Sequence, residues 1–247
     1  MNQATVAYDA KFFQDKPFQT DYESIAAIIV NFYQPKTVAD FGCGPGYLSR
    51  ELAKLGVKVT AVDGFSQPNF SDLNVEFHTV NLNDPIAIAN VFAEKKFDMA
   101  ISLEVAEHLN PSVSSDLVNW LTQVAPVVVF SAAVPGQIGV GHINLQPRDF
   151  WHNEFTRHGF LCADRLREKL HKIPSIASWY RYNIVDYVHV NHPLVPQAEE
   201  VIQRLIASES AATSAYFTEY DNPHIADVPV KFYLACRQLV KKMIGRA

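Results

Sequence analysis

Short apolar runs alternate along the chain with longer amphipathic stretches. The apolar runs are rich in Val, Ile, Phe and Ala and are bounded by turn residues, a pattern that predicts buried strands. The stretches between them place apolar residues at helical spacing. Strands that alternate with helices favour a parallel, doubly wound sheet that binds its ligand at the carboxyl ends of the strands. The predicted strands are 37–41, 57–62, 75–80, 97–102 and 127–132, and helices are predicted at 85–93 and 112–124.

A further helix should precede the first strand. Thr20 and Glu23 have the spacing of a capping box, and apolar residues recur on one helical face from Tyr22 to Phe32. The aromatic stretch before it, 7–18, is expected either to pack on the sheet edge or to cover a ligand through Tyr8, Phe12 and Phe13. These two alternatives stay open.

The pattern changes toward the end of the chain. After a predicted helix at 148–158, two segments can supply the strands that close the sheet, 160–167 and 181–189. Beyond residue 190 the sequence becomes proline-bounded and irregular, and helices are predicted at 198–206 and 228–245. We therefore expect a domain over residues 1–190 and a C-terminal helical extension over residues 191–247.

A glycine turn lies at the centre of this pattern. Gly42, Gly44 and Gly46 separate the first strand from an amphipathic helix, and Asp63 ends the second strand. Such a unit brings backbone close to a ligand at a helix start, and the acidic residue can accept both hydroxyls of a ribose. A dinucleotide fingerprint would read G-x-G-x-x-G, but here Asp40 begins a D-x-G-x-G-x-G pattern. A carboxylate at that point repels phosphates and suits a cationic sulfonium.

This stretch resembles motif I of the class I S-adenosylmethionine-dependent methyltransferases; a dehydrogenase or a plain tight turn is the alternative. The resemblance implies a Rossmann-like, mostly parallel sheet with an antiparallel closing strand. It also implies that Asp40 and the glycines hold the methionine part of the cofactor and that Asp63 binds the ribose. In addition it implies that Asn81 faces the adenine and that Leu82 and Leu103 line the cofactor site.

Titratable residues follow the fourth and fifth predicted strands. If Glu104 opens a helical turn, Glu107 and His108 lie on its face, and the glycine-rich loop after the fifth strand carries His142. One interpretation makes His108 or His142 a general base for methyl transfer. A second makes Glu104, Glu107, His108 and His142 the ligands of Mg²⁺, Mn²⁺ or Fe²⁺. A third assigns Glu107 and His108 only to capping and solvating the helix.

A second resemblance concerns this cluster. EVAEHL followed by a loop histidine resembles the metal-using segments of ubiquinone-pathway O-methyltransferases and small-RNA terminal 2'-O-methyltransferases. Over residues 8–190, the segments VDGF, EVAEHL, FSAAVPGQIGVGHINLQPRDFW and SWYRYN are similar to a bacterial methyltransferase group associated with surface-glycan and natural-product pathways. That group shows a run like HVNEQW near Asn144, which Leu145 and Pro147 interrupt here.

Composition narrows the functional classes. Hydrophobic residues make up 48% of the 247 residues and charged residues 19%, values typical of a globular protein. The net charge of -5 argues against nucleic acid or an acidic membrane as partner. The three cysteines are scattered, so a disulfide framework or zinc site is not expected. The polar start, MNQATVAYD, and the absence of a long apolar run predict a cytoplasmic protein.

The resulting hypothesis is a methyltransferase that moves a methyl group from S-adenosylmethionine to an oxygen, less readily a nitrogen, of a small molecule or sugar. Its rivals are an RNA 2'-O-methyltransferase and a non-catalytic subunit that binds the cofactor and a partner protein. The sequence leaves open whether the protein forms a homodimer.

Overall fold

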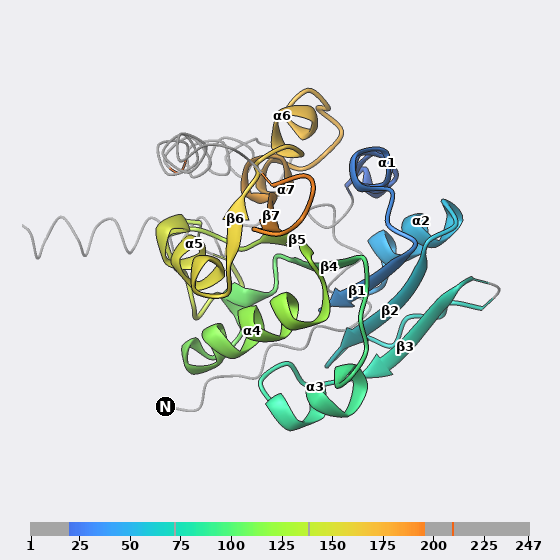
Figure 1. Ribbon diagram of the computed structural model, residues 1–247, viewed down its shortest axis with the longest axis horizontal. Helices are drawn as coiled ribbons and strands as arrows, with labels where there is room; N and C mark the ends of the chain where they lie inside the picture. The colour runs from blue at the N-terminus through green and yellow to red at the C-terminus, as the bar shows by residue number, and fades with distance from the viewer. Residues whose placement is uncertain (1–19, 72, 138, 196–208, 210–247) are drawn as a thin grey trace, which may run out of the picture.

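The computed structural model describes residues 20–71, 73–137, 139–195 and 209 (Figure 1). The expected aromatic segment at 7–18 and the expected helices at 198–206 and 228–245 lie outside the described residues. Most of the proposed C-terminal extension therefore stays a prediction.

The sheet has seven strands in the order β3-β2-β1-β4-β5-β7-β6. The pairs from β3 to β5 are parallel, whereas β7 pairs antiparallel with both β5 and β6. This topology confirms the predicted Rossmann-like sheet with an antiparallel closing strand. The strands are β1 Thr37–Phe41, β2 Lys58–Asp63, β3 Val75–Thr79, β4 Met99–Leu103, β5 Val127–Ser131, β6 Phe160–Cys162 and β7 Val185–His189.

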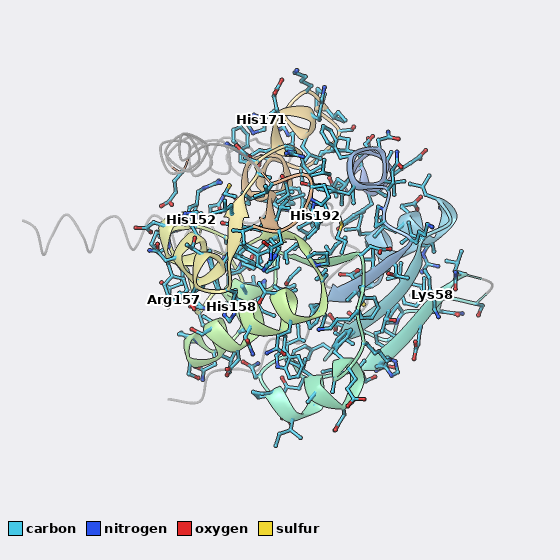
Figure 2. The ribbon with its side chains drawn as sticks, viewed as in Figure 1. Lys58, His152, Arg157, His158, His171 and His192 are labelled. Carbon is cyan, nitrogen blue, oxygen red and sulfur yellow. The ribbon has the colours of Figure 1, made fainter. Side chains whose placement is uncertain are left out.

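Helices cover both faces of the sheet (Figure 1). The side chains, drawn as sticks in Figure 2, include a separate hydrophobic core for each face. Neighbouring residues of β1 show the alternation, because Val38 belongs to one core and Ala39 to the other. One face packs against α3 Pro85–Phe92, α4 Ser114–Val124 and α5 Arg148–Arg157. The other packs against α1 Tyr22–Tyr33, α2 Tyr47–Lys54, α6 Arg167–Leu170 and α7 Ser178–Asn183.

The expected capping box at the start of α1 is wrong by one residue. Asp21 is the N-cap, because its carboxylate accepts hydrogen bonds from the main-chain N–H of Ser24 at 2.9 Å and from the Ser24 hydroxyl at 2.8 Å. The Thr20 hydroxyl instead accepts a hydrogen bond from the main-chain N–H of Ala177, at 2.7 Å. Thr20 thus ties α1 to the segment that leads into α7.

The closing strands are shorter than predicted. β6 ends at Cys162, and the chain forms the short helix α6 from Arg167. β7 begins only at Val185, because residues 178–183 form α7. Val185 pairs with Phe130 near the carboxyl end of β5, so the end of α7 lies at the edge of the sheet where the parallel strands end.

Candidate functional site

The glycine turn between β1 and α2 is held by backbone and by unusual dihedral angles. Gly42, Gly44 and Gly46 have φ values of 82°, 53° and 77°, in the left-handed region that favours glycine. The N–H groups of Gly42 and Cys43 donate to the carbonyl of Val62 at 2.8 and 3.0 Å. The turn is therefore fixed to the end of β2.

Two of these glycines are required by the protein's own packing. A Cβ atom on Gly46 would lie 2.2 Å from the Phe70 ring, and one on Gly42 would lie 2.5 Å from the Val105 side chain. Phe70 and Val105 thus occupy the space that larger residues would need. From the sequence alone, these glycines are explained only by a sharp turn of the backbone and its close approach to a ligand.

Asp63 links the turn to the loop after β2. Its Oδ2 accepts a hydrogen bond from the N–H of Gly44 at 2.9 Å, and its Oδ1 accepts from the N–H groups of Phe65 and Ser66 at 2.8 and 2.7 Å. The carboxylate is half-buried at the carboxyl end of β2. It lies where a ribose contact is predicted, and it also orders the backbone around that place.

Asp40 lies beneath the turn and is only 5% exposed. The Ser49 hydroxyl, from α2, donates to its Oδ2 at 2.5 Å. Burial raises the Asp40 pKa to about 6, which the Ser49 hydrogen bond opposes and the charge of Asp63 reinforces. Sequence reasoning missed Ser49, although its position beside Leu48 and Leu52 on the apolar face of the predicted helix is a signal that could have identified it.

The other predicted cofactor residues occupy three different environments. Asn81 is exposed, and its side-chain oxygen accepts a hydrogen bond from the N–H of Asn83 at 3.0 Å. Leu82 is 6% exposed and belongs to the core on the α3–α5 face. Leu103 is half-buried at the end of β4 and packs against the other core.

Glu104 does not open a helical turn, as the sequence pattern suggested. Its φ is +55°, in the left-handed region, and the following turn is a 3-10 helix at Ala106–His108, η3, before a second one at Pro111–Val113, η4. The Glu104 N–H donates to the Ser131 carbonyl at 3.1 Å and to the Ser131 hydroxyl at 3.0 Å. These bonds hold Glu104 against the end of β5 and explain the departure from helical geometry.

Glu107, His108 and His142 come together from the two loops. One ligand atom from each lies within 4.8 Å of the others, and the His108 and His142 rings meet edge to face with centroids 4.8 Å apart. Of the four predicted metal ligands, the structure groups these three. Glu104 is outside that group, and its Oε1 accepts a hydrogen bond from the Asn183 amide at 3.3 Å.

Burial dominates the electrostatics of this cluster. It raises the pKa of Glu104 to about 7, and it raises the pKa of Glu107 further with help from the charge of Glu104. Burial lowers the pKa of His108 to about 4, reinforced by His142, and it also lowers the pKa of His142. Both imidazoles are therefore neutral near pH 7, the form that serves as a base or a metal ligand.

The tautomer of His142 follows from its partner. Its Nδ1 lies 2.8 Å from the Gln137 carbonyl oxygen, which can only accept, so Nδ1 carries the proton and Nε2 keeps its lone pair. A Cβ atom on Gly139 would lie 2.5 Å from that Nε2. The His142 imidazole therefore occupies the space that a side chain on Gly139 would need.

A family model matches a large part of the chain. Residues 20–163, more than half of the chain, match the family model described as "Methyltransferase domain". The chain belongs to this family. Together with the sheet order and the D-x-G-x-G-x-G turn, the match makes it a class I S-adenosylmethionine-dependent methyltransferase.

Curated relatives of this methyltransferase match it over part of their length. A ubiquinone biosynthesis O-methyltransferase from Colwellia psychrerythraea is 34% identical over 104 residues, which cover 39% of this chain and 40% of the relative. The mitochondrial enzyme of the same name from Arabidopsis thaliana is 39% identical over 85 residues, covering 30% of this chain and 24% of the relative. A ribosomal protein L11 methyltransferase from Campylobacter concisus is 40% identical over 74 residues, covering 29% and 26%.

Solved structures share the fold of this methyltransferase. The 1,6-didemethyltoxoflavin-N1-methyltransferase of Burkholderia thailandensis, solved with 1,6-didemethyltoxoflavin and S-adenosylhomocysteine, has a TM-score of 0.52 at 15% identity, over 74% of this chain and 82% of that one. Across residues 20–71, 73–137 and 139–195, no helix is both long and apolar enough to cross a membrane.

Proposed function

We propose that this methyltransferase transfers the methyl group of S-adenosylmethionine to an oxygen of a small molecule or sugar, with a divalent cation held by Glu107, His108 and His142. Several curated relatives carry the name O-methyltransferase, which supports oxygen as the acceptor atom. The net charge of -5 favours a small acceptor over RNA.

The observation that carries the cation is the state of Glu107. Its side chain is fully buried, and within the described part of the chain no hydrogen bond of good geometry reaches either carboxylate oxygen, although the main-chain N–H groups of Glu107 and Ala133 and the Glu104 carboxyl are close enough to affect its pKa. A buried carboxylate without well-formed hydrogen bonds is costly unless a proton or a cation neutralises it. The two neutral imidazoles beside it complete a donor set of one carboxylate and two histidines, which suits Mn²⁺ or Fe²⁺ and accommodates Mg²⁺.

The glycine turn and the ends of β2 and β3 would bind the cofactor. Gly42, Gly44 and Gly46 would admit the methionine part, and Asp63 would accept the ribose hydroxyls while it holds the N–H of Gly44. Asn81 would face the adenine. S-adenosylmethionine supplies a methyl group on a sulfonium, which is already electrophilic, so the protein has to align the acceptor, exclude water and accept one proton.

The reaction forms the bond between the acceptor oxygen and the methyl carbon as the bond between sulfur and that carbon breaks. The sulfonium becomes a neutral thioether, and the acceptor hydroxyl loses a proton. When bound, the cation would orient the hydroxyl and lower its pKa. The Nε2 lone pair of His142, fixed by the hydrogen bond at Nδ1, would then bind the cation, so the proton would pass to the carboxylate of Glu104, which lies outside the three ligands.

Transfer of labelled methyl from S-adenosylmethionine tests this function. The protein would be incubated with Mg²⁺ or Mn²⁺ and with separate pools of extracted metabolites, glycans and RNA. We expect label as an O-methyl group in a metabolite or glycan pool, and none with Glu107→Gln. Glu154→Gln is a matched control, because Glu154 is also buried but pairs with Arg157 on α5. Label only in RNA would contradict the acceptor class, and cofactor binding without label in any pool would favour the non-catalytic subunit.

A further inference from the structure

The segment SWYRYN, which forms α7, ends in a residue that reaches into the site. Asn183 is 4% exposed and lies beyond residues 20–163, the part of the chain that matches the family model. Its Nδ2 donates to Glu104 Oε1 at 3.3 Å and to Gln137 Oε1 at 2.9 Å. One amide thus contacts both loops of the site, the one after β4 and the one after β5.

The orientation of this amide is determined by its neighbours. Arg148 Nη2, which can only donate, lies 3.5 Å from Asn183 Oδ1 and 2.5 Å from the Tyr182 carbonyl oxygen. The Gln137 amide also donates to Asn183 Oδ1, at 3.4 Å. The oxygen of Asn183 must therefore face Arg148, which turns its NH₂ group toward Glu104.

Gln137 connects Asn183 to His142. Its side-chain oxygen accepts from the Val134 N–H at 2.8 Å as well as from Asn183, and its main-chain carbonyl accepts the Nδ1 proton of His142. Gln137 is 1% exposed, so water does not replace these bonds readily. The chain of contacts runs from Arg148 through Asn183 and Gln137 to the imidazole.

We propose that Asn183 is a positioning residue that holds Glu104 and, through Gln137, the Nδ1-protonated tautomer of His142. It acts through Glu104 and Gln137 and is not itself one of the proposed cation ligands Glu107, His108 and His142. The role in turnover rests on the proposed function, whereas the effect on His142 can be measured without an acceptor.

Nuclear magnetic resonance of ¹⁵N-labelled histidine side chains reads the tautomer of His142 directly, with the signal assigned through His142→Ala. In the wild type, with Mg²⁺ or chelator present, we expect a protonated Nδ1 and an unprotonated Nε2. Asn183→Leu should convert this signal to a mixture of tautomers. Gly139→Ala, which pushes on the ring itself, should also displace it.

Asp186→Asn is the matched control for lost stability. Asp186 is fully buried in the adjoining β7, and its carboxylate accepts from the Tyr33 hydroxyl and the N–H groups of Arg165 and Leu166. This variant should lower the melting temperature and leave the His142 signal unchanged. Should Asn183→Leu not fold, the isosteric Asn183→Asp serves instead, because its carboxylate keeps Arg148 but faces the oxygens of Glu104 and Gln137.

Once a methyl acceptor has been identified, the kcat of folded Asn183 variants should be about tenfold or more below that of the wild type. Their Kd for S-adenosylhomocysteine should stay within about twofold of the wild-type value. Absence of methyl transfer in the wild type would overturn the proposed function and leave the tautomer result standing. A folded Asn183 variant with an unchanged His142 signal would overturn the positioning role.

Discussion

Buried carboxylates determine the character of the site at the scale of single residues. Asp40 is buried and Glu104 is half-buried, and their pKa values are raised to about 6 and about 7. The pKa values of His108 and His142 are lowered. Glu104 and Glu107 have raised pKa values beside two histidines with lowered ones, and such opposite shifts within one cluster are typical of a site for ions or protons.

Glu104→Gln should show the pH dependence that burial imposes. The native pKa of Glu104, about 7, lies above its ordinary value of 4.5, so the native state binds more protons between these values and the wild type loses stability as pH rises through them. The lowered histidine pKa values act in the opposite direction, so only the difference between variant and wild type isolates Glu104. That difference in unfolding free energy should grow in favour of Glu104→Gln from about pH 4.5 to 7, on the order of 1–3 kcal/mol.

Chemical denaturation of both proteins across this pH range, in chelator, measures the difference. A difference that does not change with pH would show that Glu104 has an ordinary pKa in the native protein.

Asp63→Ala should weaken S-adenosylmethionine binding by about 1.5–3 kcal/mol, because a charged acceptor of hydrogen bonds is lost. Calorimetry on the folded variant measures it. Asp98→Ala is the control, since Asp98 likewise accepts hydrogen bonds from main-chain N–H groups, those of Lys36 and Thr37 at 2.8 and 2.9 Å, but at the amino end of β1, away from the glycine turn. Equal affinity losses in both variants would remove Asp63 from the cofactor site.

At the scale of elements, sequence patterning located the sheet well and the loops poorly. The predicted first strand, 37–41, agrees with β1, because a buried parallel strand is a continuous apolar run. The short helix α7, Ser178–Asn183, was not predicted, and its last three residues were interpreted as the start of the strand at 181–189. Local periodicity could not foresee the left-handed φ of Glu104, which depends on Ser131, 27 residues away along the chain.

In the candidate site, too, some residues could be predicted from the sequence and others only from the structure. The D-x-G-x-G-x-G turn and the residues after β4 and β5 could be named from sequence, because the carboxyl ends of parallel strands share one edge. Asn183 could not, since its contact with Glu104 joins residues 79 apart. Its position depends on the antiparallel return of β7, which no spacing in the sequence encodes.

Gly46→Ala tests how tightly the glycine turn is packed. Gly46 and Gly56 have similar φ values, 77° and 86°, but a Cβ atom on Gly56 would meet nothing within 4 Å. Gly56→Ala should therefore cost only the left-handed strain, about 1–2 kcal/mol. Gly46→Ala adds the clash with Phe70 and should cost about 1–3 kcal/mol more, with weaker cofactor binding. Urea denaturation compares the two, and equal losses would contradict the packing of Phe70 on the turn.

At the scale of the whole molecule, the doubly wound sheet joins a cofactor half, around β1 and β2, to an acceptor half, around β4, β5 and β7. Asp40 belongs to the first half and lies below the turn. Because a carboxylate there disfavours phosphate, S-adenosylhomocysteine should raise the melting temperature through mass action under conditions where NAD does not. Thermal denaturation at equal ligand concentrations measures this, and equal stabilisation by NAD would favour a dehydrogenase.

The central claim is methyl transfer that depends on a cation at Glu107, His108 and His142. Turnover measured in excess chelator, before and after Mg²⁺ or Mn²⁺ is restored, tests it most directly, with cofactor affinity measured in parallel. The account predicts that chelation abolishes turnover, that either cation restores it, and that the Kd of S-adenosylmethionine barely changes. Full activity in chelator, with no metal in the purified protein, would contradict the claim and leave His108 or His142 as a simple base.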